Sequence, residues 1–228
     1  FKSGGLYTVD DFDYDIATNT YTPKATTPII EEYRTKVQPG DIKYVDIDGD
    51  GKITPTEDRC YIGSAIPRYN YTIGLNAAWR GIDFSLFLQG VGKCDGYIGG
   101  MGRHAFTELA NYPQKAHLDR WTWENQNPHA SYPRFTYDET YNRDEFSSFW
   151  LEDASYLRVK NLQVGYTVPR KGIISKMHIE NLRIYFSGEN LWTFTDFFSS
   201  YDPEIPVSSG GYYPITASYS LGLSITFK

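Results

Sequence analysis

Alternating carboxylates near residue 50 are the most specific chemical signal in this sequence. Asp46, Asp48 and Asp50 occupy positions 1, 3 and 5 of a twelve-residue segment, with Gly51 at position 6 and Glu57 at position 12. Calcium loops use this spacing because the backbone curls around one ion and needs glycine at its sharpest turn. The sequence therefore predicts a structural Ca²⁺ ion. The candidate ligands are Asp46, Asp48, Asp50, Lys52 through its backbone carbonyl, Glu57 and Asp58.

The end of this segment has a second interpretation. Thr54, Pro55 and Glu57 fit the N-cap, first and third positions of a capping box that starts a short helical turn, which would leave Asp58 to close the site. An Asp/Gly-rich turn that holds no metal is the alternative to both. Residues 41–45 before the loop predict an extended segment, so the pattern indicates an ion that pins a loop and not a helix–loop–helix sensor.

Other groupings of reactive residues are weak. The four histidines are scattered without the spacing of a zinc site, and the glycine runs near residues 90 and 100 are not followed by a phosphate-binding helix. The sequence contains no nucleophile-elbow or P-loop motif. We therefore predict no catalytic residues and no enzyme.

Long alternations of apolar and polar residues predict the strands that must carry these segments. In the last stretch, every second residue from Ile215 to Phe227 is apolar and those between are small and polar or glycine. The third stretch changes phase near Lys160–Asn161, which predicts a β-bulge. The five stretches cover 68–80, the return from 82 after a tight turn at Arg80–Gly81, 149–168, 182–194 and 215–227.

The strand lengths indicate a membrane. A bilayer-spanning strand needs about 9–11 residues, and the strands starting near 68, 82, 156, 182 and 215 reach that. Aromatic residues lie toward strand ends, as interfacial girdles require. The connections alternate short and long, over 80–81, 93–148, 169–180 and 195–214, as in outer-membrane barrels. This pattern predicts that the last strand runs to a periplasmic C-terminus.

The remaining segments predict little regular structure. Residues 1–40 indicate an ordered loop with a short strand near Ile29–Val37, and residues 107–121 indicate a short helix. Cys60 and Cys94 flank the first hairpin on the same side, so one disulfide is plausible there, with two free thiols as the alternative.

Composition excludes several classes of function. Among 228 residues, 22 are Lys or Arg and 28 are Asp or Glu, and the net charge of −6 argues against nucleic-acid binding. No run of 18 apolar residues could form a spanning helix. The first residues carry neither Met nor an export signal, so we expect a mature piece or a fragment. An aromatic content of 17% beside 40% hydrophobic residues fits a barrel with a wet lumen and aromatic rims.

Several motifs, in order, resemble the C-terminal part of SusC-like TonB-dependent outer-membrane transporters. The likeness runs from about residue 39 to the end. Two departures are Lys228 after the usual terminal aromatic and the two cysteines. The matching stretches are Pro39–Tyr44, Asp46–Gly51, Glu57–Arg59, Ile62–Gly63, Gly81–Ser85, Gln89–Gly90, Asp119–Trp121, Glu124–Asn125, Tyr132–Arg134, Ser155–Asn161, Ser187–Leu191 and Tyr201–Glu204.

This resemblance implies an all-β fold, the C-terminal strands of an antiparallel transmembrane barrel of about 22 strands with long extracellular loops. Residues 1–67 would be an extracellular segment with the calcium loop, and residues 68–228 would supply about five spanning strands. The family sits in the outer membrane of Gram-negative bacteria. It imports oligosaccharides or peptides with a SusD-like surface lipoprotein, and the TonB complex drives it through an N-terminal part that has no counterpart here.

Flat aromatic side chains in the loops could stack on sugar rings or meet the lipoprotein, although packing among the loops is an equal alternative. These residues are Trp121, Trp123, Tyr132, Tyr201, Tyr212 and Tyr213. A rival interpretation of the whole chain is a secreted, calcium-stabilised, all-β glycan-binding module. It predicts a soluble monomer that folds without detergent.

Overall fold

The computed structural model describes residues 1–100, 103–106, 112–137, 141–171, 174, 178–198, 201–205, 213 and 215–227. The chain forms two compact units. The loop unit contains Phe1–Gly63 and Tyr97–Glu152, and the sheet unit contains Ser64–Gly96, Asp153–Pro206 and Tyr212–Lys228. The first boundary lies near the expected division at residue 67, but residues 97–152 pack with the N-terminal segment. Among the described residues we find no helix with the length and apolar content that a membrane crossing requires.

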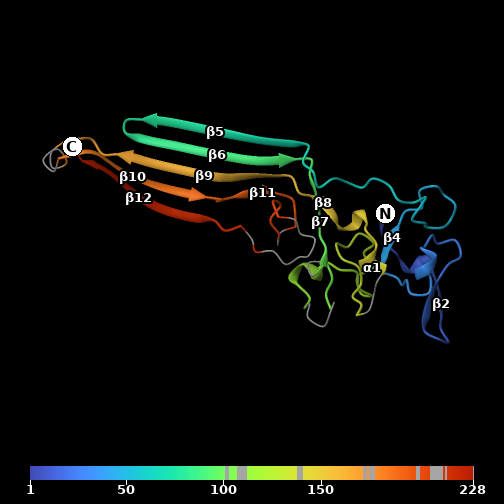
Figure 1. The fold of residues 1–228 in the computed structure, drawn as a ribbon. Helices are drawn as coiled ribbons and strands as arrows, with labels where there is room; N and C mark the ends of the chain where they lie inside the picture. Colours follow the sequence, from blue (N-terminus) through green and yellow to red (C-terminus); the bar gives the residue numbers. More distant parts are fainter. Residues whose placement is uncertain are drawn as a thin grey trace. The chain divides into compact units, whose positions relative to one another are not determined.

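The sheet unit is a long antiparallel meander, which confirms the all-β fold (Figure 1). Its strand order is β12-β10-β9-β6-β5, and the short strand β11 (Thr193–Thr195) pairs with β9. The strands are ten to twelve residues long, about twice the usual length in globular proteins. Their bounds are β5 (Tyr69–Trp79), β6 (Ile82–Gly92), β9 (Tyr156–Thr167), β10 (Ile179–Glu189) and β12 (Ser218–Phe227).

The tight turn between β5 and β6 forms where the sequence predicts it. Arg80 and Gly81 both have positive φ, +49° and +88°, as a two-residue hairpin turn of type I′ requires. Trp79 then pairs with Ile82, and the register continues without a break to Tyr69 opposite Gly92. Apolar residues of β5 thus lie opposite apolar residues of β6 over most of one face, as Ile73 with Leu88 and Leu75 with Leu86.

Register carries this alternation across the whole sheet. Ile82, Tyr166, Ile184 and Leu223 form one row on what we call the apolar face. The next row, on the polar face, contains Asp83, Gly165, Tyr185 and Gly222. The two faces differ because successive side chains of a strand point to opposite sides.

The predicted bulge is confirmed, and three strand boundaries are corrected. Leu88 pairs with Val159 and Phe87 with Asn161, so Lys160 is the extra residue. The strand expected over 182–194 stops at Glu189, because Asn190 has a left-handed φ of +50°. The strand expected from 149 is divided, since Leu151–Asp153 forms β8, which pairs with β7 (Asp95–Tyr97). Strand β12 begins at Ser218, after the expected Ile215.

The loop unit is built from short elements around an aromatic core. Strand β1 (Ser3–Leu6) pairs with β4 (Ile42–Tyr44), and β2 (Phe12–Asp15) pairs with β3 (Thr20–Pro23). The only other regular elements described are single turns. They are η1 (Val9–Asp11), η2 (Glu31–Tyr33), η5 (Lys115–Leu118), α1 (Tyr141–Asp144) and η6 (Ser148–Trp150).

Two predictions for the loop unit are wrong. The strand expected over Ile29–Val37 is absent, because Glu31–Tyr33 forms η2 and only Ile30 makes a bridge, to Ile53. In the described part of the helix expected over 107–121, only the 3₁₀ turn η5 forms; residues 107–111 lie outside the described residues. Pro113 lies inside the expected helix, and proline in a helix interior removes a backbone hydrogen bond and clashes with the preceding turn.

Candidate metal centre and the networks around it

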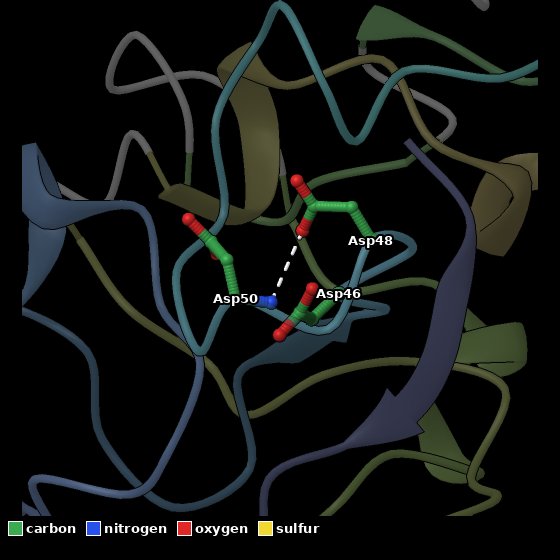
Figure 2. Close-up of side chains that lie close together, drawn as sticks. All are labelled: Asp46, Asp48 and Asp50. Atoms are coloured by element: carbon green, nitrogen blue, oxygen red, sulfur yellow. Dashed lines mark hydrogen bonds between the residues drawn. The ribbon is translucent and has the colours of Figure 1, made fainter.

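Three aspartates converge in the loop after β4. Side-chain oxygens of Asp46, Asp48 and Asp50 all lie within 4.8 Å of one another (Figure 2). Asp46 is half-buried and the other two are exposed. Within the described residues, this is the only such group of three acidic, histidine or cysteine side chains. The structure thus brings together positions 1, 3 and 5 of the predicted calcium loop.

Backbone amides hold the carboxylates in place. Asp46 accepts hydrogen bonds from the N–H of Gly49 at 2.7 Å and of Gly51 at 2.8 Å. Asp48 accepts from the N–H of Asp50 at 3.2 Å, the bond drawn in Figure 2. The curl needs residues that tolerate positive φ, and Gly49 and Gly51 adopt +79° and +86°.

Backbone N–H groups and neighbouring carboxylates shift the pKa values of these aspartates in opposite directions. The N–H of Gly51, more than that of Gly49, holds the pKa of Asp46 below its ordinary value. The N–H of Asp50 also lowers the pKa of Asp48, but partial desolvation and the Asp50 and Asp46 carboxyls outweigh it, and the net shift is upward. Crowded carboxylates repel each other, and a hard cation bound between them would relieve the repulsion. The donor set therefore fits Ca²⁺.

The predicted closing ligands have other partners. Asp58 is almost fully buried and its two oxygens accept the N–H groups of Ile47 and Thr54, each at 2.7 Å. Glu57 exchanges hydrogen bonds with Thr54, whose hydroxyl donates to the carboxylate at 3.2 Å. Neither belongs to the group of three. The helical turn read as an alternative does form, since the N–H of Asp58 donates to the carbonyl of Thr54 at 3.1 Å.

A buried ion pair lies at the centre of the loop unit. Asp41 is fully buried, and Arg134 donates to its two oxygens from Nε at 2.7 Å and Nη2 at 3.1 Å. Asn142 Nδ2 and the N–H of Gln38 add bonds of 2.8 Å each. Burial raises the pKa of Asp41, and Arg134 opposes that shift. Asp41 and Arg134 both lie in stretches that resemble the family, but nothing in the sequence pattern indicates that they pair.

Comparison with known proteins identifies the family, although no family model matches the chain. TonB-dependent receptor P3 of Formosa agariphila is 30% identical over 206 residues, and receptor P26 of that organism is 31% identical over 205. The chain belongs to the TonB-dependent receptor family. The alignments cover 83% and 82% of this chain but 19% and 20% of those two receptors, so the chain spans about a fifth of their length.

Solved structures give the same fold for this TonB-dependent receptor chain. The RagAB peptide importer in its open-open state matches with a TM-score of 0.61 and 22% identity, over 83% of this chain and 21% of that one. The closed-closed state of the same importer matches with a TM-score of 0.59. The resemblance read from the motifs is confirmed, and so is the fold class. TonB-dependent receptors are β-barrels of the outer membrane, and the matching relatives are named receptors and not enzymes.

The receptor chain divides the predicted contact aromatics into two groups. Trp121 and Tyr132 are buried in the core of the loop unit, where neither offers a face to a ligand. Trp123 is half exposed, with its ring stacked on Tyr21 at 5.3 Å. Tyr213 is exposed and Tyr201 is partly buried, whereas Tyr212 lies outside the described residues.

The two cysteines of the receptor chain are free thiols in this structure, and the disulfide considered from the sequence stays a prediction. Cys60 is exposed. Cys94 is buried, and its thiol donates to the carbonyl of Ala65 at 3.3 Å. Burial raises the pKa of Cys94, which keeps it in the unreactive thiol form.

Proposed function

We propose that this chain is part of an outer-membrane importer that takes up oligosaccharides or peptides. A TonB complex would supply the energy through a part of the receptor outside this chain. The observation that carries the proposal is the two-faced sheet, whose long strands expose an apolar face and a polar face. Leu221 and Leu223 of β12, for example, are 85% and 59% exposed in a protein whose family spans the outer membrane.

The apolar face has the side chains expected against lipid. It is made of residues such as Ile73 and Leu75 on β5 and Ile184 on β10, all exposed. Its aromatic members lie toward strand ends, including Tyr69 and Trp79 at the two ends of β5. Aromatic girdles at two interfaces account for this distribution. The polar face would line the water-filled interior of the barrel.

The connections suggest the orientation and the partner. We place the short turn at Arg80–Gly81 in the periplasm with the C-terminal end of β12, and the long connections outside the cell. The partner would be a SusD-like surface lipoprotein bound to the long connections. The two-component peptide importer RagAB, whose fold this chain shares, motivates both the partner and the peptide alternative.

Uptake by cells tests the proposal. A strain that lacks the receptor gene should fail to accumulate one class of labelled oligosaccharide or peptide, and the restored gene should return uptake only when TonB is present. Receptor purified gently from membranes should carry a lipoprotein with it. Equal uptake with and without the gene, over a panel of both substrate classes, would reject import by this receptor.

The rival module makes the opposite prediction for the isolated chain. A secreted glycan-binding protein of these 228 residues would be monodisperse without detergent, would melt cooperatively and would bind sugar alone. The importer interpretation predicts aggregation, because the exposed apolar face has no lipid to cover it.

We further propose that the aspartate loop binds one structural Ca²⁺ through Asp46, Asp48 and Asp50. The support is the convergence of the three carboxylates and the chemistry of that donor set. The Lys52 carbonyl would be a further ligand, and Glu57 and Asp58 would join only if they left their present hydrogen bonds. Bound calcium would hold the loop after β4 in one conformation.

Calcium titration of the receptor tests this second proposal. Calcium should slow proteolysis within residues 46–58, and chelator should restore it. Asp48→Asn should abolish the calcium effect, whereas Asp13→Asn, an exposed aspartate on β2, should leave it unchanged. Identical digestion of the wild-type receptor with calcium and with chelator would contradict the site.

A further inference from the structure

Two of the sequence motifs meet in the sheet unit as one ionic network. Arg158 belongs to the stretch Ser155–Asn161 and Asp202 to the stretch Tyr201–Glu204. The Nη2 atom of Arg158 donates to both carboxylate oxygens of Asp202, each at 2.6 Å. Neither motif suggests this pairing alone, since 44 positions separate the two residues.

A second pair repeats the same spacing. Lys160 Nζ donates to Glu204 Oε2 at 2.9 Å, so positions 158 and 160 face positions 202 and 204. Arg158 Nη1 also lies 3.4 Å from Glu204 Oε2, which joins the two pairs. The alternation of basic residues on β9 therefore matches the alternation of acidic residues in the segment before β12.

Burial makes the pairing compulsory for Arg158. Its side chain is 1% exposed, and it is further held by Thr193 Oγ1, which accepts from Nε at 2.8 Å. A buried guanidinium that loses its carboxylate is left with an uncompensated charge, which costs several kcal/mol. Asp202 is therefore needed to neutralise the buried Arg158 guanidinium.

The acidic segment is shaped to present both carboxylates. Asp202 Oδ1 accepts the N–H of Glu204 at 3.0 Å, and the N–H of Ile205 donates to the Asp202 carbonyl at 3.1 Å. Pro203 between them fixes φ and limits the unfolded alternatives of the turn. Both hydrogen bonds join residues of the acidic segment itself and do not involve β9.

The network lies on the polar face of the sheet. Arg158 pairs in register with Gln89, and Tyr156 pairs with Val91, both on the polar side of β6. Lys160, the extra residue of the bulge, has no register partner on β6, so its side chain can turn toward Glu204.

We propose that Arg158 and Lys160 are positioning residues that hold residues 201–205 against the polar face, as a latch. This inference rests on the proposed function, in which the polar face lines the import passage. The latched segment then covers the part of the passage wall beside Gln89. Arg158 Nη1 and Glu204 Oε1 are buried without hydrogen-bond partners, so the Glu204 half of the latch is the less satisfied half.

Hydrogen exchange on the intact receptor in detergent tests the latch without substrate, lipoprotein or TonB. Asp202→Asn should speed exchange of the backbone amides of residues 201, 202, 204 and 205 at least tenfold and leave β10 and β12 unchanged. Lys160→Glu, which removes the pair with Glu204 and leaves Asp202 in place, should give a smaller increase. Lys171→Glu, an exposed residue in the connection after β9, is the matched control and should change nothing.

Thiol labelling reports whether the segment covers the face. In a receptor with Cys60→Ala and Cys94→Ala, a Gln89→Cys variant should react with a charged reagent at least threefold faster when Asp202→Asn is added. Unchanged exchange at 201–205 in both Asp202→Asn and Lys160→Glu would overturn the latch. If Asp202→Asn does not fold, unchanged exchange in Lys160→Glu alone would overturn it, because Lys160 is only partly buried and that variant is expected to fold. Import could fail with the exchange results intact, so the two proposals fail separately.

Discussion

The loop unit and the sheet unit treat apolar surface in opposite ways. In the loop unit, large side chains such as Trp121, Trp150 and Tyr141 are almost completely buried together. In the sheet unit, Leu221 and Ile184 are exposed on strands that pair with each other in a regular antiparallel register. The loop unit is thus packed as a water-soluble domain, whereas the sheet unit needs something apolar outside itself.

Two ion pairs, one from each unit, differ in burial, although the sheet unit also holds the buried pair of Arg158 and Asp202. Asp41 of the loop unit is fully buried with three donors around it, while Asp83 of the sheet unit pairs with Arg183 on the polar face with 35% of its side chain exposed. A pair in water contributes little to stability, but a buried carboxylate depends on its partners. Substitutions of buried and of exposed partners should therefore differ in how much they lower the unfolding free energy.

The largest effect should follow loss of the buried carboxylate. Asp41→Ala removes the buried carboxylate that accepts hydrogen bonds from Arg134 and Asn142, and we expect the loop unit to lose about 3–5 kcal/mol of unfolding free energy. Urea unfolding of the receptor, followed by the fluorescence of the buried tryptophans, measures it. Arg34→Ala, which removes an exposed pair with Glu31, should cost less than about 1 kcal/mol. Equal losses of unfolding free energy in the two variants would show that burial does not make the Asp41 pair more important than the exposed pair.

The next effect should depend on which face of β12 is charged. Leu221→Arg places a cation on the apolar face and should cost about 2–4 kcal/mol in a bilayer if that face meets lipid near the membrane centre. Ser220→Arg, one residue away on the polar face, should be nearly neutral. Reversible folding of the receptor into lipid vesicles measures both. A Leu221→Arg receptor as stable as the Ser220→Arg receptor would mean that lipid does not cover the apolar face.

Two glycines should respond differently to a methyl group. At Gly40 of the loop unit, φ is +89° and a Cβ would lie 2.5 Å from the Trp121 ring, so Gly40→Ala should cost about 1–3 kcal/mol. At Gly165 of the sheet, the Cβ would meet the ends of the Arg183 and Asp83 side chains, which can swing away. Gly165→Ala should lower the unfolding free energy by less than about 1 kcal/mol, which is what an exposed ion pair such as Arg183 with Asp83 contributes. Thermal melting of both variants ranks them, and a larger loss at Gly165 would contradict the ranking.

Sequence predicts the sheet unit far better than the loop unit, for a physical reason. Alternation with a period of two is a local signal, and it located β5, β6 and even the bulge at Lys160. The loop unit is held by contacts distant in sequence, such as Asp41 with Arg134, and by 3₁₀ turns without a periodic signature. Its strand over Ile29–Val37 was therefore predicted wrongly.

The candidate sites divide in the same way. The three aspartates converge because their spacing is local, so the sequence found them. Trp121 and Tyr132 were offered as contact residues because sequence shows an aromatic ring but not what covers it. The pairing of Arg158 with Asp202 needs the fold, although both residues stood in stretches that resemble the family.

The smallest effect should appear in the pH dependence of the loop unit. Burial raises the pKa of Glu152 on β8 to about 7, and none of the described cations lowers it again, in contrast to Asp41 with its Arg134. The folded state then binds this proton more tightly than the unfolded state, whose glutamate has a pKa near 4.5. Stability from Glu152 is fully present below about pH 4.5 and is lost as the pH rises through about 7.

Glu152→Gln should flatten this decline, because the amide resembles the protonated acid and does not titrate. Unfolding of the receptor measured from pH 4.5 to 8 should show the largest gain of the variant over the wild type at the alkaline end. Glu124→Gln, at an exposed position of the same unit, is the control and should follow the wild-type curve. A Glu152→Gln receptor that loses stability at pH 8 would show that the ionised carboxylate has a partner, and that the loop unit compensates its buried acids as Asp41 does.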